Sequence, residues 1–94
     1  MTTLELHLRP ALAARVRLQT DPLTREPVLL FPEGLLVLNP TAHEIVSRCD
    51  GTMTIERIIA ALAEEYDAPT AAITADVLTC LTDLQERNLI TLSP

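Results

Sequence analysis

The chain has 94 residues, of which 48% are hydrophobic and only 2% aromatic, and its 13 acidic and 7 basic residues give a formal net charge of −6. This length predicts one small domain, and the acidic balance excludes an extended basic surface for nucleic acid. No stretch approaches the roughly 20 apolar residues that span a bilayer, and no basic segment followed by an apolar one opens the chain. We therefore expect a cytoplasmic protein with no membrane association.

The first 13 residues carry no capping or turn signal strong enough to assign an element. We expect residues 1–13 to form a flexible N-terminal tail and residues 14–94 to form a single domain. Within that domain, Val16 and Leu18 alternate with polar side chains, a period of two that fits a half-exposed strand.

The next feature is a pair of apolar runs, residues 28–31 and 35–38, on either side of Pro32-Glu33-Gly34. Proline and glycine suit a tight turn, so this stretch predicts a β-hairpin. A hairpin with one face in water alternates apolar and polar residues, whereas the second run is apolar throughout. Either the domain covers both faces of this strand, or one face or its edge binds something else, which we expect to be a peptide. The residues concerned are Leu35, Leu36, Val37 and Leu38.

Three helices follow. Thr41 and Glu44 have the spacing of a capping box and predict a helix over residues 41–49, which Gly51 would end. A second helix begins near Thr54 and ends at Asp67-Ala68-Pro69. A third spans residues 70–87, with Asn88 in the left-handed conformation that ends a helix. Residues 89–92 then return as a short strand or an extended tail.

The third helix has an unusually broad apolar face. At about 100° per residue its apolar side chains spread over roughly 160°, which is wider than the ~100° needed to pack on one core. One interpretation assigns part of this face to a groove, bordered by Asp76, Asp83 and Arg87 as a recognition rim. The alternative is that the apolar residues contact the first two helices and the charged ones are simply solvated. The apolar positions are Ile73, Val77, Leu78, Cys80, Leu81 and Leu84.

The order of elements predicts an α+β fold that resembles a winged helix-turn-helix, with a three-stranded antiparallel sheet at the N-terminus followed by three helices. Cys49 and Cys80 lie outside any CxxC spacing and on apolar stripes, so we expect buried thiols in a reducing compartment.

Neither catalysis nor metal binding is expected. His7 and His43 have no partner at a ligand spacing, and Gly34 and Gly51, the only glycines, cannot form a phosphate-binding loop. No nucleophile has a base placed beside it in the sequence. We therefore expect no catalytic residue, no metal and no cofactor.

The ordered segments LLFPEG, LVLNPTA and CDGTMT, with Arg9-Pro10 before them and Asp76-Val77 after them, resemble the PqqD family of pyrroloquinoline quinone (PQQ) biosynthesis proteins. The resemblance covers nearly the whole chain from Arg9. It implies a chaperone that binds the ribosomal precursor peptide PqqA and presents it to the radical SAM enzyme PqqE, which cross-links a glutamate and a tyrosine of that peptide.

In related recognition elements the peptide adds as an antiparallel strand to the last strand of the wing, in a groove closed by the third helix. By this resemblance the peptide-binding residues here are Leu35, Leu36, Val37, Leu38, Asp76, Val77, Cys80, Leu81, Leu84 and Arg87. Addition of a strand satisfies an exposed row of backbone donors and acceptors, which agrees with the apolar second run of the hairpin.

The sequence leaves two alternatives open, one for the function and one for the oligomeric state. A DNA-binding winged-helix regulator would need basic side chains on its recognition helix, whereas residues 70–87 carry more acidic than basic residues. We expect a monomer, and a weak or domain-exchanged homodimer that hides the hairpin edge against itself is the other alternative.

Overall fold

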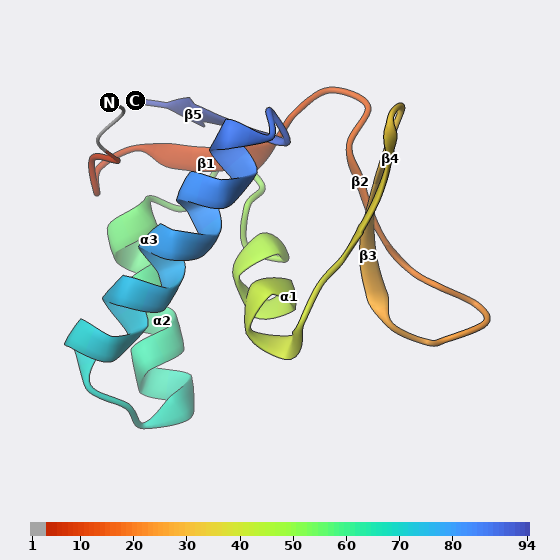
Figure 1. Ribbon diagram of the computed structural model, residues 1–94. Helices are drawn as coiled ribbons and strands as arrows, with labels where there is room; N and C mark the ends of the chain where they lie inside the picture. The colour runs from red at the N-terminus through yellow and green to blue at the C-terminus, as the bar shows by residue number, and fades with distance from the viewer. Residues whose placement is uncertain (1–3) are drawn as a thin grey trace.

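The computed structural model describes residues 4–94 and contains three helices and two antiparallel sheets, which confirms the predicted α+β class (Figure 1). In chain order the elements are β1 (Arg9–Leu12), β2 (Arg17–Thr20), β3 (Pro27–Phe31), β4 (Gly34–Val37), α1 (Pro40–Val46), α2 (Ile55–Tyr66), α3 (Thr70–Glu86) and β5 (Ile90–Ser93).

The predicted hairpin is present and forms most of a three-stranded sheet with the order β2-β3-β4. Phe31 lies opposite Gly34, so Pro32 and Glu33 make a two-residue turn between β3 and β4. Leu29 lies opposite Leu36 in the same register. This sheet stands beside α1, away from α2 (Figure 1).

A second sheet corrects the prediction of one sheet preceded by a flexible tail. Arg9–Leu12 forms β1, which pairs with β5 so that Leu12 lies opposite Ile90. On its other side, the Leu12 N–H donates to the Cys49 carbonyl, and the Gly51 N–H donates to the Pro10 carbonyl. The prediction of a tail over residues 1–13 is therefore wrong for residues 9–12, while residues 1–3 lie outside the described part of the chain.

The residues before β1 are also held by distant backbone groups. The carbonyls of Leu6 and Leu8 accept hydrogen bonds from the N–H groups of Glu56 and Ile55, at 3.0 and 2.9 Å. These two N–H groups lie at the start of α2, where no residue of the helix itself can accept from them. The tail prediction failed here because these partners lie some 50 residues further along the chain.

The start of α1 also differs from the prediction. The helix begins with Pro40, and the cap is Asn39, whose Oδ1 accepts from the Ala42 N–H at 2.7 Å. Thr41, the predicted cap, lies inside the helix, and α1 ends at Val46 rather than residue 49. Asn39 is extended because it precedes proline, which leaves its short side chain free to cap the first turn.

Replacing Asn39 with alanine should therefore lower the free energy of unfolding by about 0.5–2 kcal/mol, the usual cost of losing a cap. The matched variant Thr41→Ala should change it by less than about 0.5 kcal/mol. Urea denaturation followed by circular dichroism measures both. A larger loss for Thr41→Ala than for Asn39→Ala would contradict this assignment of the cap.

The other two helices begin and end close to where the sequence predicted. Thr54 caps α2 by accepting from the Arg57 N–H at 3.2 Å, and the left-handed Asp67 ends it. Asn88 follows α3 in the left-handed conformation, with φ of 61°. The Arg48 side chain pairs with both Glu44 and Glu65, which ties the end of α1 to α2.

The core lies where the apolar faces of the three helices meet β3 and β5. As predicted, Cys49 is buried there, whereas Cys80 is only half-buried. The largest fully buried side chains are Pro10, Leu29, Ile45, Ile55, Ile58, Leu62, Val77, Leu81 and Leu84. This arrangement leaves β4 at the margin of the core.

Candidate functional site

The candidate site begins with the free edge of β4. Among residues 4–94 this strand pairs only with β3. The Leu38 N–H donates to the Pro27 carbonyl at 2.9 Å, on the β3 side. Because successive residues of an antiparallel strand direct their backbone groups to opposite sides, Leu36 and Leu38 bond toward β3. The N–H and C=O groups of Leu35 and Val37 therefore point outward, away from the sheet.

The side chains of this strand alternate between two faces. Leu36 and Leu38 pack against the core, and Leu38 is only 5% exposed. Leu35 and Val37 lie on the other face and remain 54% and 53% exposed. The strand is therefore not covered on both faces by residues 4–94, which answers the question raised by its apolar sequence.

A groove of about 590 Å³ runs between β4, α1 and α3. Its apolar lining comes from all three elements: Leu36, Leu38, Ala42, Ile45, Cys80 and Leu84. Its polar lining consists of Asn39, Thr41, Asp76, Thr79 and Asp83, and Val37 completes it. The groove thus lies beside the free edge of β4, where an added strand could place side chains in it.

Of the ten residues predicted to bind peptide, six line this groove: Leu36, Val37, Leu38, Asp76, Cys80 and Leu84. Leu35 lies on the open face of β4. Arg87 is not part of the lining, and its Nε donates to Asp83 Oδ2 at 3.1 Å. Val77 and Leu81 are 0% exposed and belong to the core. Neither residue lines the groove, so for these two the structure favours the other interpretation of the α3 face, in which they pack inside the domain.

The prediction missed the contribution of α1, which supplies Thr41, Ala42 and Ile45 to the groove, and that of its cap residue Asn39. The sequence identified α1 as a helix but did not show that it lies against β4. One signal was available: only Leu38 and Asn39 separate β4 from α1. Such a short connection keeps the start of a helix close to the end of the preceding strand.

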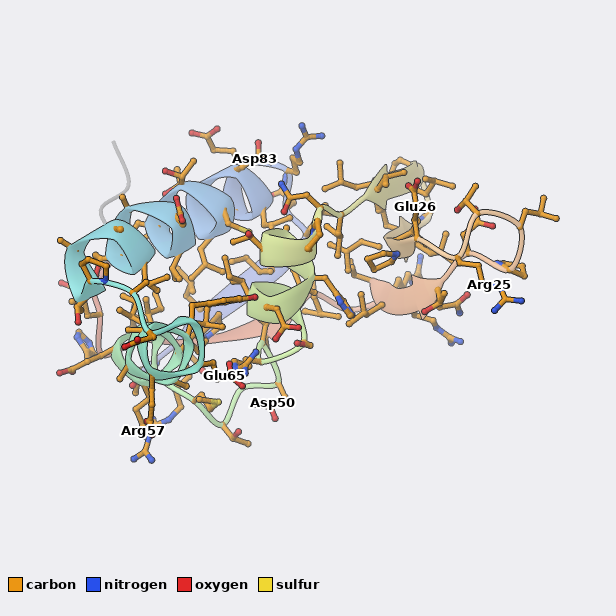
Figure 2. All side chains as sticks on the ribbon, turned by 90° about the horizontal axis from the view of Figure 1, so that it is seen from below. Arg25, Glu26, Asp50, Arg57, Glu65 and Asp83 are labelled. Carbon is orange, nitrogen blue, oxygen red and sulfur yellow. The ribbon has the colours of Figure 1, made fainter. Side chains whose placement is uncertain are left out.

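The groove has an acidic border. Asp76 and Asp83 are its charged residues, and no arginine belongs to its lining among the described residues. Figure 2 shows Asp83 on α3, on the far side from the α2 residues Arg57 and Glu65. Since the pairing of Asp83 with Arg87 is exposed and worth little, the groove favours a ligand that is apolar and not acidic.

The two thiols are poor nucleophiles at neutral pH. Burial raises the pKa of the Cys80 thiol to about 11, and the nearby Asp83 carboxylate adds to the effect. Burial raises the pKa of Cys49 to about 12, with smaller contributions from Cys80 and Asp50. Because the thiolate is the reactive form, Cys80 contributes an apolar surface to the groove rather than a reactive group.

Alkylation of Cys80 should therefore be slow at pH 7 and should rise about tenfold per pH unit up to pH 9, since the thiolate fraction grows with pH below the pKa. Mass spectrometry after iodoacetamide treatment of the Cys49→Ser variant measures this rate. The Cys80→Ser variant serves as the control, because buried Cys49 should react only when the domain unfolds. A rate that levels off below pH 9 would contradict the raised pKa.

Residues 4–94 contain no group of three or more histidine, cysteine, aspartate or glutamate side chains placed to hold a metal ion. None of the helices in that range is long and apolar enough to cross a membrane.

Comparison with known proteins gives consistent matches. The family model described as Coenzyme PQQ synthesis protein D (PqqD) matches residues 26–90. A PqqA binding protein of Xanthomonas oryzae pv. oryzae (strain KACC10331 / KXO85) is 39% identical over 98% of this chain and 100% of that protein. A PqqA binding protein of Xanthomonas campestris pv. campestris (strain 8004) is 38% identical with the same coverage.

Two solved structures have similar folds. One is the solution NMR structure of the PqqD truncation of Methylobacterium extorquens PqqCD, a functional and stand-alone RiPP recognition element. It has a TM-score of 0.75 and 34% identity and covers 87% of each chain. The crystal structure of PqqD from Xanthomonas campestris has a TM-score of 0.58 and 39% identity, and covers 84% of this chain and 88% of that one. Both similarities extend over most of the chain.

Proposed function

The chain belongs to the PqqD family, and from this premise we propose that it binds the precursor peptide PqqA in PQQ biosynthesis by adding the peptide as a strand to β4. The observation that carries this proposal is the free edge of β4 beside a 590 Å³ groove. A peptide is the ligand that can use both features, because its backbone pairs with the edge and its side chains enter the groove.

The backbone pairing involves Leu35 and Val37. Their outward N–H and C=O groups match those of an added antiparallel strand. Alternate side chains of the peptide would then enter the groove over Leu36, Ala42 and Leu84, where burial of apolar surface supplies affinity.

The charged groups of α3 would set the direction of the peptide. Asp76 and Asp83 lie at the groove border, and Arg87 holds the Asp83 carboxylate through its Nε. Charges at the rim of an interface contribute more to specificity and association rate than to affinity. We therefore assign these three residues to orientation, and the apolar lining to affinity.

The role we propose is binding rather than catalysis, in the cytoplasm, with presentation of the bound peptide to the radical SAM enzyme PqqE. The names of the relatives, PqqA binding proteins and a recognition element, support a binding role. The three-stranded sheet β2-β3-β4 is followed in the chain by three helices, and this order supports a winged-helix-like module used for peptide recognition.

Isothermal titration with PqqA peptide, and separately with duplex DNA at physiological salt, tests this function. We expect saturable binding of the peptide and none of DNA. The exposed charged residues of α3 are acidic, and Arg87 just after the helix is the one basic residue beside them, so this surface has a net negative charge that DNA phosphates would repel. The acidic residues are Asp76, Asp83 and Glu86. DNA binding without peptide binding would overturn the proposal in favour of a DNA-binding winged-helix regulator.

A homodimer remains the second candidate because the same β4 edge could pair with a second copy. Light scattering over a range of concentrations measures this association. We expect the monomer mass at low concentration, and we expect added peptide to oppose any dimer, since peptide and second copy would compete for one edge. A dimer that persists with saturating peptide bound would show that β4 is not the shared edge.

A further inference from the structure

Two hollows, not one, adjoin β4. Besides the groove, a second hollow of about 530 Å³ lies between the end of β4 and the residues that precede and open β3. Arg25, Glu26 and Pro27 border it on one side and Pro40 on another, and Val37 belongs to the lining of both hollows. Figure 2 shows Arg25 and Glu26 at the end of the molecule away from α2.

The open face of the sheet has its own apolar rows. Leu30 of β3 lies between Arg17 and Leu35, and Val28 lies between Gln19 and Val37. Residues directly opposite in a sheet share a face, so each row runs across the open face and ends at β4.

In both rows the side chain at the β4 edge is more exposed than the one in the central strand. Val28, in the central strand, is 4% exposed, whereas Val37 at the edge of the same row is 53% exposed. Leu35 ends the other row at 54% exposed. Among the described residues, each of these edge side chains has a cross-strand partner on the β3 side only. A strand added at β4 would place one side chain directly beside each of them.

We propose, on the basis of the peptide-binding function above, that the protein reads its peptide on both faces. The occupant is an extended segment with apolar side chains at successive positions rather than at alternate ones. One set enters the groove between β4 and α3, and the other set packs beside Leu35 and Val37, with the second hollow receiving the side chain next to Val37. Leu35 and Val37 thereby determine specificity through their side chains as well as pairing through their backbones.

The physical basis is the apolar surface that strand addition would cover. A peptide with polar side chains on the open face would either leave Leu35 and Val37 half exposed or desolvate its own polar groups against them. A peptide with apolar side chains there would bury both residues and gain from two cross-strand pairs. The open face therefore disfavours a peptide segment in which apolar and polar side chains simply alternate.

The double variant Leu35→Thr and Val37→Thr tests this inference. Threonine matches the shape of valine at position 37 and brings a high strand preference to both positions, but it places a hydroxyl where the apolar contact would form. We expect the Kd for PqqA to rise about 2- to 30-fold, the range for two lost cross-strand pairs. Leu23→Thr is the matched control, because Leu23 is 92% exposed in the β2–β3 connection and should leave the Kd unchanged.

Serine substitutions along the peptide, titrated against the unchanged protein, give an independent measurement that does not depend on the folding of a variant. We expect losses at consecutive positions of the bound segment. Combined with the double variant, serine at an outward position should cost much less than it does with the unchanged protein, because the same contact cannot be lost twice.

The outcomes separate this inference from the function on which it rests. Losses only at alternate peptide positions, with the double variant binding as tightly as the unchanged protein, would overturn reading on both faces and leave strand addition in place. Failure of the unchanged protein to bind PqqA at all would instead overturn the proposed function.

Discussion

Replacing Val37 with proline should weaken peptide binding at least tenfold, about 1.4 kcal/mol, while the domain remains folded. The Val37 N–H points away from β3, so its loss breaks no hydrogen bond inside the sheet. The peptide loses a donor, and the proline ring occupies space at the edge where it would pair. Leu36, which then precedes a proline, is already extended in β4 and tolerates the change.

Thr20→Pro is the matched control for this variant. Thr20 lies opposite Pro27, whose carbonyl points toward β4 and accepts from the N–H of Leu38, the residue after that strand. The Thr20 N–H therefore also points out of the sheet, but at the opposite edge on β2. Calorimetric titration with PqqA and thermal denaturation should show normal binding for Thr20→Pro and a folded domain for both variants. Strand addition at β4 is wrong if Val37→Pro binds as tightly as the unchanged protein.

Replacing Leu81 with alanine should lower the free energy of unfolding by about 2–5 kcal/mol, the cost of a cavity at a fully buried leucine. For a domain of this size the melting temperature should fall by roughly 10 °C or more. Because Leu81 offers no surface to the groove, variant molecules that remain folded should bind PqqA with nearly unchanged affinity. Denaturant unfolding and titration well below the melting temperature measure the two quantities separately.

Leu36→Ala is the matched comparison, since it removes the same atoms from a half-buried leucine that lines the groove. It should cost less stability than Leu81→Ala and more affinity for the peptide. The opposite pattern, with affinity lost at Leu81 and kept at Leu36, would mean that α3 turns or shifts when the peptide binds.

The hairpin and the helix ends could be predicted because they depend on neighbouring residues. Pro32 and Glu33 form the turn next to Gly34, Thr54 caps α2, and Asn88 ends α3, all as the sequence indicated. At α1 two local signals competed. Asn39 caps the helix instead of Thr41 because Pro40 extends the residue before it and is itself favoured at the first helical position.

The candidate site was only partly predictable. The apolar character of residues 35–38 identified β4, but α3 has more apolar positions than the groove uses. Periodicity placed Val77, Cys80, Leu81 and Leu84 on one broad face and could not divide it. The packing of α1 and α2 against α3 makes that division: Val77 and Leu81 face only the core, whereas half-buried Cys80 and the largely buried Leu84 border the groove.

The sequence by itself determined the class of fold, the hairpin, the three helices and the strand whose apolar residues exceed what one small core needs. Turns, caps and periodicity act over a few residues, and these features follow from them. Only the tertiary structure decided that β1 pairs with β5, that α1 forms a wall of the groove and that Leu35 and Val37 face outward from a free edge. These features depend on contacts between surfaces of different elements, and such contacts produce no local pattern in the sequence.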